Sequence, residues 1–118
     1  MSIEHVLAVV PVADFDVAHE WYERLFGRSA DNLPMEGLLV EWRLTETGWV
    51  QVTLDPERAG SGLLNLAVDN LESHVADVSK RGLSPGEITR VNKGVQLCGI
   101  SDPDGNTITF IGNFRVVY

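Results

Sequence analysis

The sequence has little of what several large classes of protein require. Its 118 residues include one cysteine, Cys98, which excludes an intrachain disulfide and favours a reducing compartment. Nine basic residues against 17 acidic ones give a net charge of -8, which argues against a surface for nucleic acid or anionic membranes. No apolar run reaches membrane-spanning length, and the start of the chain lacks the pattern of a signal peptide. These absences predict a cytoplasmic protein whose partner is a small molecule or another protein, with no nucleic acid and no membrane.

Familiar catalytic motifs are missing as well. The chain has no phosphate-binding glycine loop, and Ser61 lacks the strand-turn-helix setting of a nucleophilic serine. His19-Glu20 begins like the zinc-protease pattern, but the fifth residue is Glu23 and not histidine, so we interpret His19 as part of a solvated helix surface. His74 has no thiol or second histidine nearby, and we interpret it as a surface histidine or one whose hydrogen bonds are satisfied.

What the chain does contain is an internal repeat. Residues 7–25 place a strand, an acidic break and an amphipathic helix in a row, and residues 63–81 repeat this order 56 positions later. Leu7 then corresponds to Leu63. Two copies are too few for a solenoid, so the repeat predicts a paired, pseudo-symmetric domain.

The length and the 44% hydrophobic content fit one domain with a real core. We expect a single domain over residues 1–118, with module one at 1–58 and module two at 61–118. Each module is expected to have the order βαβββ, with helices that end at Gly27 and Gly82. The strands that the pattern indicates cover residues 5–12, 37–44, 48–54, 63–68, 94–100 and 106–111.

Residues 102–106, Asp-Pro-Asp-Gly-Asn, are expected to form the turn of the last hairpin. Gly105 can supply the positive φ that such a turn needs. The spacing does not match a calcium-binding loop. Cys98 falls inside an apolar strand, where it is expected to be a small buried side chain.

Two segments resemble one known superfamily. "VPVADFDVAHEWYERLFG" is similar to the opening of vicinal oxygen chelate proteins, the glyoxalase/bleomycin resistance protein/dioxygenase superfamily. "SDPDGNTITF" is similar to the penultimate turn and last strand of those proteins. The resemblance implies an α+β fold in which two βαβββ modules form a cupped mixed sheet around a cavity. Many members dimerise, so it also implies a homodimer, with the cup formed either within one chain or across two.

The resemblance also indicates where a metal ion would be bound. Metal-using members place His, Glu or Gln ligands on the first and last strands of each module, and the corresponding positions here are Leu7, Gln51, Leu63 and Thr109. Two leucines donate nothing, and an amide with a hydroxyl is too weak a donor set for a divalent ion. A register slip of two residues would bring His5 to the first position, but it would stand alone. We expect no metal and no cofactor.

A cavity in this fold would be lined by alternate residues of the strands. Such a lining suits a neutral or aromatic ligand stacked on Trp49 and oriented by Gln51 and Asn65. Trp49 could instead fill the core, and the pattern leaves open whether Trp42 or its two neighbours reach the cavity. The ligand-binding residues that we predict are His5, Leu7, Trp49, Gln51, Leu63, Asn65, Thr107 and Thr109.

Three functions fit this sequence. The first is a metal-free protein that binds a small neutral, aromatic or cationic organic molecule, as the bleomycin resistance-like members do. The second is a metal-dependent lyase, isomerase or dioxygenase of the same superfamily, or an acid-base enzyme that uses His5 or Glu41. The third is a structural or regulatory partner protein. The fold alone does not choose among them.

Overall fold

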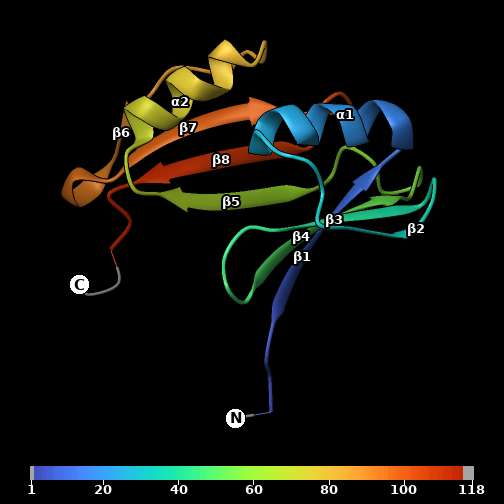
Figure 1. Ribbon diagram of the computed structural model, residues 1–118. Helices are drawn as coiled ribbons and strands as arrows, with labels where there is room; N and C mark the ends of the chain where they lie inside the picture. The colour runs from blue at the N-terminus through green and yellow to red at the C-terminus, as the bar shows by residue number, and fades with distance from the viewer. Residues whose placement is uncertain (1, 116–118) are drawn as a thin grey trace.

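A computed structural model describes residues 2–115 as two similar halves, each with one helix and a four-stranded sheet (Figure 1). The βαβββ order expected for both modules is confirmed. Module one consists of β1 (Val6–Val12), α1 (Phe15–Phe26), β2 (Asn32–Met35), β3 (Leu39–Arg43) and β4 (Gly48–Leu54). Module two consists of β5 (Leu63–Val68), α2 (Leu71–Lys80), β6 (Thr89–Arg90), a short 3-10 helix η1 (Asn92–Gly94), β7 (Gln96–Ser101) and β8 (Thr107–Gly112).

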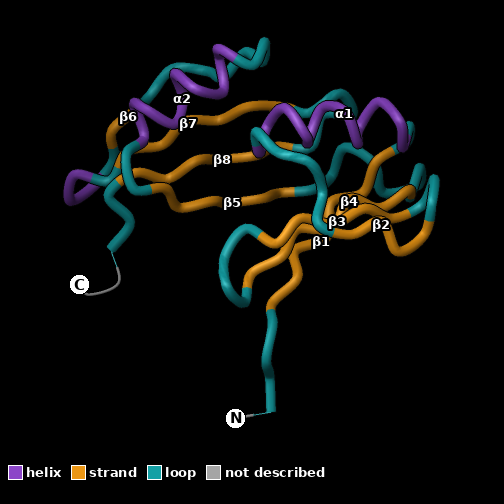
Figure 2. The backbone as a smooth tube through the Cα atoms, in the orientation of Figure 1, coloured by secondary structure: helices purple, strands orange, loops and turns teal. Residues whose placement is uncertain are grey.

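Both sheets have the same topology. Their strand orders are β1-β4-β3-β2 and β5-β8-β7-β6, with β1 parallel to β4, β5 parallel to β8 and the other pairs antiparallel. Figure 2 shows α1 and α2 on the same side of the two sheets. Within the part of the chain that the structure describes, no helix lies over the opposite side of either sheet, and we call these two surfaces the uncovered faces. In residues 2–115, neither helix has the length and apolar character that crossing a membrane requires.

The helix starts reproduce the sequence repeat in atomic detail. The Asp14 carboxylate accepts a hydrogen bond of 3.2 Å from the backbone N–H of Val17 at the start of α1. The side chain of Asn70, 56 positions later, accepts one of 3.0 Å from the N–H of Ser73 at the start of α2. Each bond satisfies an N–H that a helix leaves unpaired in its first turn. Gly27, with φ of +72°, adopts the left-handed conformation that ends α1.

The core lies between the helices and the sheets, and the alternation of strand residues selects its members. In β1, Val10 and Val12 are buried against α1, whereas Leu7 and Val9 lie on the uncovered face. Trp42 is fully buried, which answers the question that the sequence leaves open: its neighbours, and not Trp42, lie on the uncovered face. The largest fully buried side chains are Trp42, Tyr22, Phe110, Leu25, Ile108, Val12, Val40, Val52, Val78, Asn106 and Cys98.

Two short strands, β2 and β6, lie outside the set that the sequence indicates. They form the outer edges of the two sheets, and every residue in both is exposed. A strand without a buried face shows no apolar alternation, so the sequence gives no signal for it. Pro34 within β2 fits an edge position, because proline cannot donate to a neighbouring strand.

Asn106 connects the two modules from inside the protein. Its side chain is 1% exposed. Its Oδ1 accepts hydrogen bonds from the backbone N–H groups of Gly60 and Gly62, at 3.1 and 2.7 Å, in the segment that links the modules. Its Nδ2 donates to the carbonyl oxygen of Pro11 in β1 and to Asp102, both at 2.7 Å. One side chain of module two therefore binds the linker and the first strand of module one.

Asp102 extends this connection into the core of module one. Its Oδ2 accepts a hydrogen bond of 2.7 Å from the hydroxyl of Tyr22 in α1, and its Oδ1 accepts from the backbone N–H groups of Asp104 and Asn106, both at 2.9 Å. Burial, followed by the hydrogen bond and the negative charge of Asp102, raises the pKa of Tyr22. The turn expected at residues 102–106 is present, but it also joins the modules.

Candidate functional site

The uncovered face of module one carries the residues that the sequence predicts for β1 and β4. In the strand register, Leu7 lies opposite Trp49 and Val9 lies opposite Gln51, while Glu41 of β3 is the other neighbour of Gln51. Leu7 and Val9 are 46% and 58% exposed, so aliphatic side chains face outward here. This face is therefore partly apolar, and neither helix of residues 2–115 covers it.

Polar groups form two short chains of contacts on this face. The Glu41 carboxylate accepts hydrogen bonds from the side-chain amides of Gln51, at 2.8 Å, and Asn32, at 3.0 Å. The indole N–H of Trp49 donates to Nδ1 of His5 at 3.0 Å. The guanidinium of Arg43 lies 5.8 Å from the centre of the Trp49 ring. Trp49 is thus a half-buried surface residue in a defined orientation, and the core position belongs to Trp42.

The uncovered face of module two is neutral at the corresponding positions. Leu63 lies opposite Thr107, and Asn65 lies opposite Thr109. Leu63 is 83% exposed, the highest value among the large apolar side chains of the described residues. This face therefore offers hydroxyl and amide groups beside one exposed leucine.

The structure brings some of these residues together across the modules. Trp49 and Asn65 both line a crevice of about 190 Å³ between the edge of β1 and the edge of β5, together with Leu44 and Leu66. Within the described residues, no hydrogen bond joins the two uncovered faces. The other residues that the sequence predicts as ligand-binding remain on the faces of their own sheets.

The four positions at which metal-using members place ligands do not fit a metal ion. Leu7 and Leu63 have no donor atom, and Gln51 offers only the neutral oxygen of an amide whose N–H is bonded to Glu41. Thr109 adds only a neutral hydroxyl. Within residues 2–115, no group of three or more His, Cys, Asp or Glu side chains is placed to hold a metal ion.

His74 of α2 is not the surface or satisfied histidine that the sequence indicates. Its Nε2 is buried and has no hydrogen-bond partner within residues 2–115. The imidazole packs on the ring of Phe110 with a centroid distance of 4.5 Å. The sequence repeat contains the missed signal, since residue 74 corresponds to Ala18, which is fully buried against the sheet of module one. A histidine at such a position faces the core side of its helix.

Burial is the main influence on the charge state of His74. Loss of solvent lowers its pKa below the usual value, and the positive charge of Arg81 lowers it further. The carboxylates of Asp77 and Asp69 act in the opposite direction but do not cancel these effects. The imidazole is therefore neutral at physiological pH.

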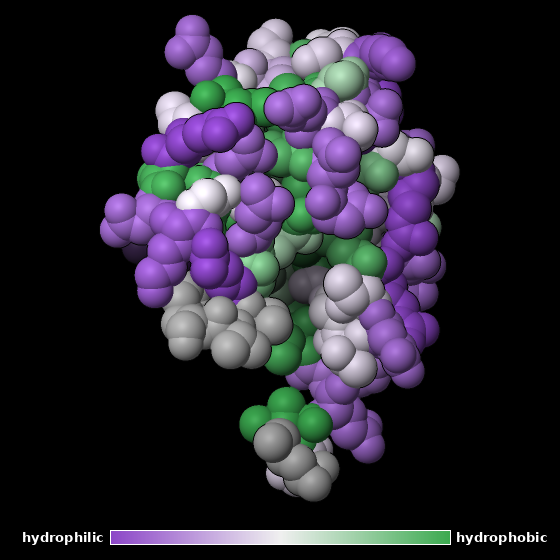
Figure 3. All heavy atoms as spheres, turned by 90° about the vertical axis from the view of Figure 1, so that its left-hand side faces the viewer, coloured by the Kyte–Doolittle hydropathy of each residue, from purple (hydrophilic) through white to green (hydrophobic). Residues whose placement is uncertain are grey.

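A pocket of about 230 Å³ lies beside His74, on the helix side of the sheet and at the junction of the modules. Figure 3 shows a hollow with hydrophobic residues around it on the face that is at the left in Figure 1. The pocket receives residues from both modules. Its lining consists of Phe26, Leu44, Thr45, Leu66, Ala67, Val68, His74 and Phe110.

His19 also departs from the expectation of a solvated helix surface. Its ring contacts Phe15 and Trp42 edge-on, each with a centroid distance of 5.8 Å. Only 30% of its side chain is exposed, and its Nε2 lies 4.0 Å from Glu23. His19 therefore packs on the core while one nitrogen remains near the helix surface. Cys98, by contrast, is buried as expected, and burial raises the pKa of its thiol.

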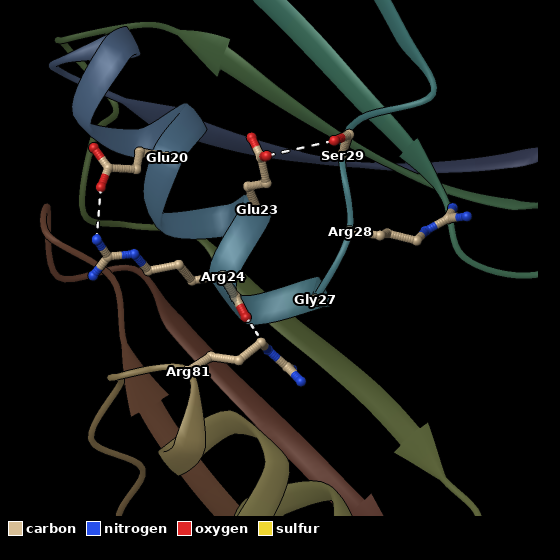
Figure 4. A pocket seen from close by; sticks show the side chains of 7 residues that line it. All are labelled: Glu20, Glu23, Arg24, Gly27, Arg28, Ser29 and Arg81. Atoms are coloured by element: carbon tan, nitrogen blue, oxygen red, sulfur yellow. Dashed lines mark hydrogen bonds and ion pairs between the residues drawn. The ribbon is translucent and has the colours of Figure 1, made fainter.

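A second surface pocket surrounds the end of α1, and arginines of both modules lie around it (Figure 4). Arg81, the residue that follows α2, donates to the carbonyl oxygen of Arg24 and, at 2.8 Å, to that of Leu25. These carbonyls belong to the last turn of α1 and lack partners within their helix. Arg28 forms an ion pair of 2.7 Å with Asp31. Arg81 therefore connects module two to the end of α1, and Arg28 stabilises the loop that follows this helix.

The fold resembles that of several solved proteins. A glyoxalase/bleomycin resistance protein from Catenulispora acidiphila DSM 44928 is 30% identical, with a TM-score of 0.86 over 92% of this chain and 96% of that one. TnmS3, an antibiotic-binding protein from Streptomyces sp. CB03234, is 27% identical, with a TM-score of 0.76 over 95% of this chain and 98% of that one. A lactoylglutathione lyase from Agrobacterium tumefaciens shares the fold at 18% identity, with a TM-score of 0.72 over 92% of each chain. Neither a protein-family model nor a curated protein sequence matches the chain.

Proposed function

The chain belongs to the glyoxalase/bleomycin resistance protein family, and on this premise we propose that it is a metal-free binding protein for a small neutral, aromatic or cationic organic molecule. The observation that carries this proposal is the side-chain chemistry of the uncovered faces. Leu7 and Leu63 occupy positions where metal-using members need a ligand, while aromatic and amide groups lie beside them. The similarity to TnmS3, which is described as an antibiotic-binding protein, supports the same class of function.

Trp49 is the proposed platform for the ligand. Its indole N–H is already bonded to His5, so the orientation of the ring is fixed before a ligand arrives. A flat aromatic ligand gains most from such a preoriented ring, because little side-chain entropy is lost on binding. Asn65 lines the same crevice and supplies an amide that can donate and accept hydrogen bonds.

Glu41 gives the proposed site its charge preference. Its carboxylate is held by Gln51 and Asn32 on the uncovered face of module one. The net charge of -8 attracts cations over longer distances. A ligand that combines an aromatic ring with a positive charge would therefore satisfy both the indole and the carboxylate, although Arg43 near Trp49 reduces this preference locally.

We also propose a homodimer in the cytoplasm. β1 and β5 each pair on one side only within their sheets, and the apolar side chains of Val6 and Leu63 are 69% and 83% exposed there. Edge strands with exposed aliphatic residues favour association. A second copy that covers them would close the uncovered faces into a cup.

Light scattering tests the proposed dimer. The measured mass should correspond to two chains for the unaltered protein and to one chain for Leu63→Glu. A mass of one chain for the unaltered protein at all concentrations would contradict the dimer.

A thermal-shift titration tests the binding function. Bleomycin is the first probe, and ethidium, a planar aromatic cation, is the second. Each is expected to raise the melting temperature of the protein, and Trp49→Ala should remove this effect because the stacking surface is lost. Trp21→Ala is the matched control, since Trp21 lies on α1 and packs against Tyr22, on the helix side of the sheet.

Two further results would decide against this proposal. Equal shifts in the protein and in Trp49→Ala would place the ligand elsewhere. Stoichiometric zinc, nickel, iron or manganese in protein purified without chelators, together with binding that a chelator abolishes, would favour the metal-dependent lyase, isomerase or dioxygenase.

A further inference from the structure

The crevice beside Trp49 and the pocket beside His74 are neighbours along the junction of the modules. Leu44, Thr45 and Leu66 line both of them. We propose that one ligand occupies both spaces: an aromatic cation whose ring stacks on Trp49 and whose unbranched apolar tail extends into the pocket. This inference rests on the function proposed above and specifies the class of ligand.

A surface turn forms the boundary between the two spaces. Leu44 and Thr45 belong to the segment between β3 and β4, where the backbone N–H groups of both residues donate to the carbonyl oxygen of Gly48, at 2.9 and 3.2 Å. Thr45 is exposed, and Leu44 and Leu66 are half-buried. The boundary therefore has surface atoms, and a ligand can lie across them without entering the closed core.

The pocket end selects an apolar group. Phe26 of α1 and Val68 of β5 are half-buried there, and Phe110 of β8 is buried. Among the described residues that line the pocket, none is Asp, Glu, Lys or Arg; Nε2 of His74 is buried, and Thr45 contributes one neutral hydroxyl. A charged group would lose its hydration there without gaining a counter-charge. An aliphatic tail instead gains free energy, because it removes its own surface and that of the apolar side chains from water.

The crevice end selects the ring and the polar part of the ligand. Trp49 presents an indole whose N–H is already bonded to His5, and a cation over such a ring is attracted by its π electrons. Asn65 adds an amide to the same lining. This difference between the two ends gives the ligand one orientation, with its head at Trp49 and its tail in the pocket.

The two volumes set the size of the ligand. The crevice has about 190 Å³ and the pocket about 230 Å³. An apolar cavity of about 150 Å³ in another protein accommodates benzene, so the crevice takes one ring and the pocket takes a tail of roughly eight carbon atoms. A longer tail would extend into water and gain little.

Calorimetric titration with a chain-length series tests the proposal. The probes are benzyldimethylalkylammonium salts whose alkyl group is methyl, butyl, hexyl, octyl or decyl, each below the concentration at which it forms micelles. Complete burial of a methylene contributes about 0.8 kcal/mol, or about fourfold in affinity, so this partly open cleft should give about two- to fourfold for each methylene as far as octyl. The decyl compound should bind no more tightly than the octyl compound. The amide nuclear magnetic resonance signals of Val68 and Phe110 should shift with the octyl compound and not with the methyl compound.

Val68→Phe fills the pocket and leaves the crevice as it is, because Val68 lines only the pocket. This variant should bind the methyl compound as tightly as the unaltered protein does and should lose the gain from longer tails. Val17→Phe is the matched control, since it makes the same substitution at an exposed position of α1 that lines neither space. It should keep the whole gain.

The outcomes separate this inference from the function on which it rests. Binding of the methyl compound that depends on Trp49, with no gain for longer tails, would overturn the inference and leave the proposed function intact. A gain that persists in Val68→Phe, or that is lost equally in Val17→Phe, would also overturn it. The same holds for octyl binding that is as tight in Trp49→Ala as in the unaltered protein, since the ring would then not stack on Trp49. No binding of any compound in the series would overturn both proposals.

Discussion

Asn106 is the residue whose removal should most weaken the connection between the modules. Asn106→Ala deletes four hydrogen bonds, two from the linker glycine amides and one each to Pro11 and Asp102. A neutral hydrogen bond contributes about 1 kcal/mol, and one to a charged group about 1.5–3 kcal/mol. Since the side chain is 1% exposed, water has little access to replace these bonds. Three neutral bonds and one bond to a carboxylate give an expected loss of about 4.5–6 kcal/mol in the free energy of unfolding, beyond the range of most substitutions.

Urea unfolding followed by two signals would measure this loss. Trp21, Trp42 and Trp49 are the three tryptophans of the chain, and all lie in module one. Tryptophan fluorescence therefore reports on module one, while far-ultraviolet circular dichroism reports on both modules. In the unaltered protein the two transitions should coincide; in Asn106→Ala they should separate, because the modules unfold less cooperatively.

Asn70→Ala is the control for the loss of an asparagine that makes one exposed hydrogen bond. It should cost about 1 kcal/mol and leave the two transitions coincident. A loss of stability in Asn106→Ala no greater than that in Asn70→Ala, or transitions that remain superimposed, would contradict a role of Asn106 in joining the modules.

Three further predictions concern buried groups. Tyr22→Phe removes the hydrogen bond to the buried carboxylate of Asp102 and should lower the free energy of unfolding by about 1.5–3 kcal/mol in urea; a change below half of this would show that the bond contributes little. Folding lowers the pKa of His74, mainly through burial, so the native protein favours the neutral imidazole. The contribution of His74 to the free energy of unfolding is therefore complete above its unfolded pKa of about 6.5. It is lost as the pH falls from that value through the lower pKa of the folded state. Urea unfolding at several pH values should show this loss, and it should be smaller in His74→Leu; an identical pH dependence in the two proteins would contradict the assignment. The thiol of Cys98 should react slowly with Ellman's reagent in the native protein and rapidly in urea, and a fast native reaction would contradict its burial.

Alternation along the strands made the uncovered faces predictable from the sequence. The superfamily resemblance indicates Leu7 and Gln51, and because residues two apart on a strand share a face, alternation then adds Trp49. The strand around Trp42 was harder, because apolar residues occupy both parities in residues 37–44. Only its pairing with β4 decides that Trp42 enters the core and Glu41 faces out.

Long-range contacts account for most of what the sequence did not predict. Asp102 and Asn106 have the residue types of an ordinary exposed turn, and their burial depends on Tyr22 and Pro11, which lie 80 and 95 residues away. The pocket beside His74 depends in the same way on Phe26 and Leu44 from the other module. Whether the predicted ligand-binding residues act together in one site stays a prediction.

The repeat has a consequence for how such a protein can acquire a new activity. Ala18 of α1 and His74 of α2 occupy equivalent positions in the two modules. In module one the small methyl group allows close packing of α1 on its sheet, whereas in module two an imidazole lies beside a pocket. Duplication thus allows one module to keep a small, close-packed side chain while the equivalent position of the other module carries a polar side chain within the same fold.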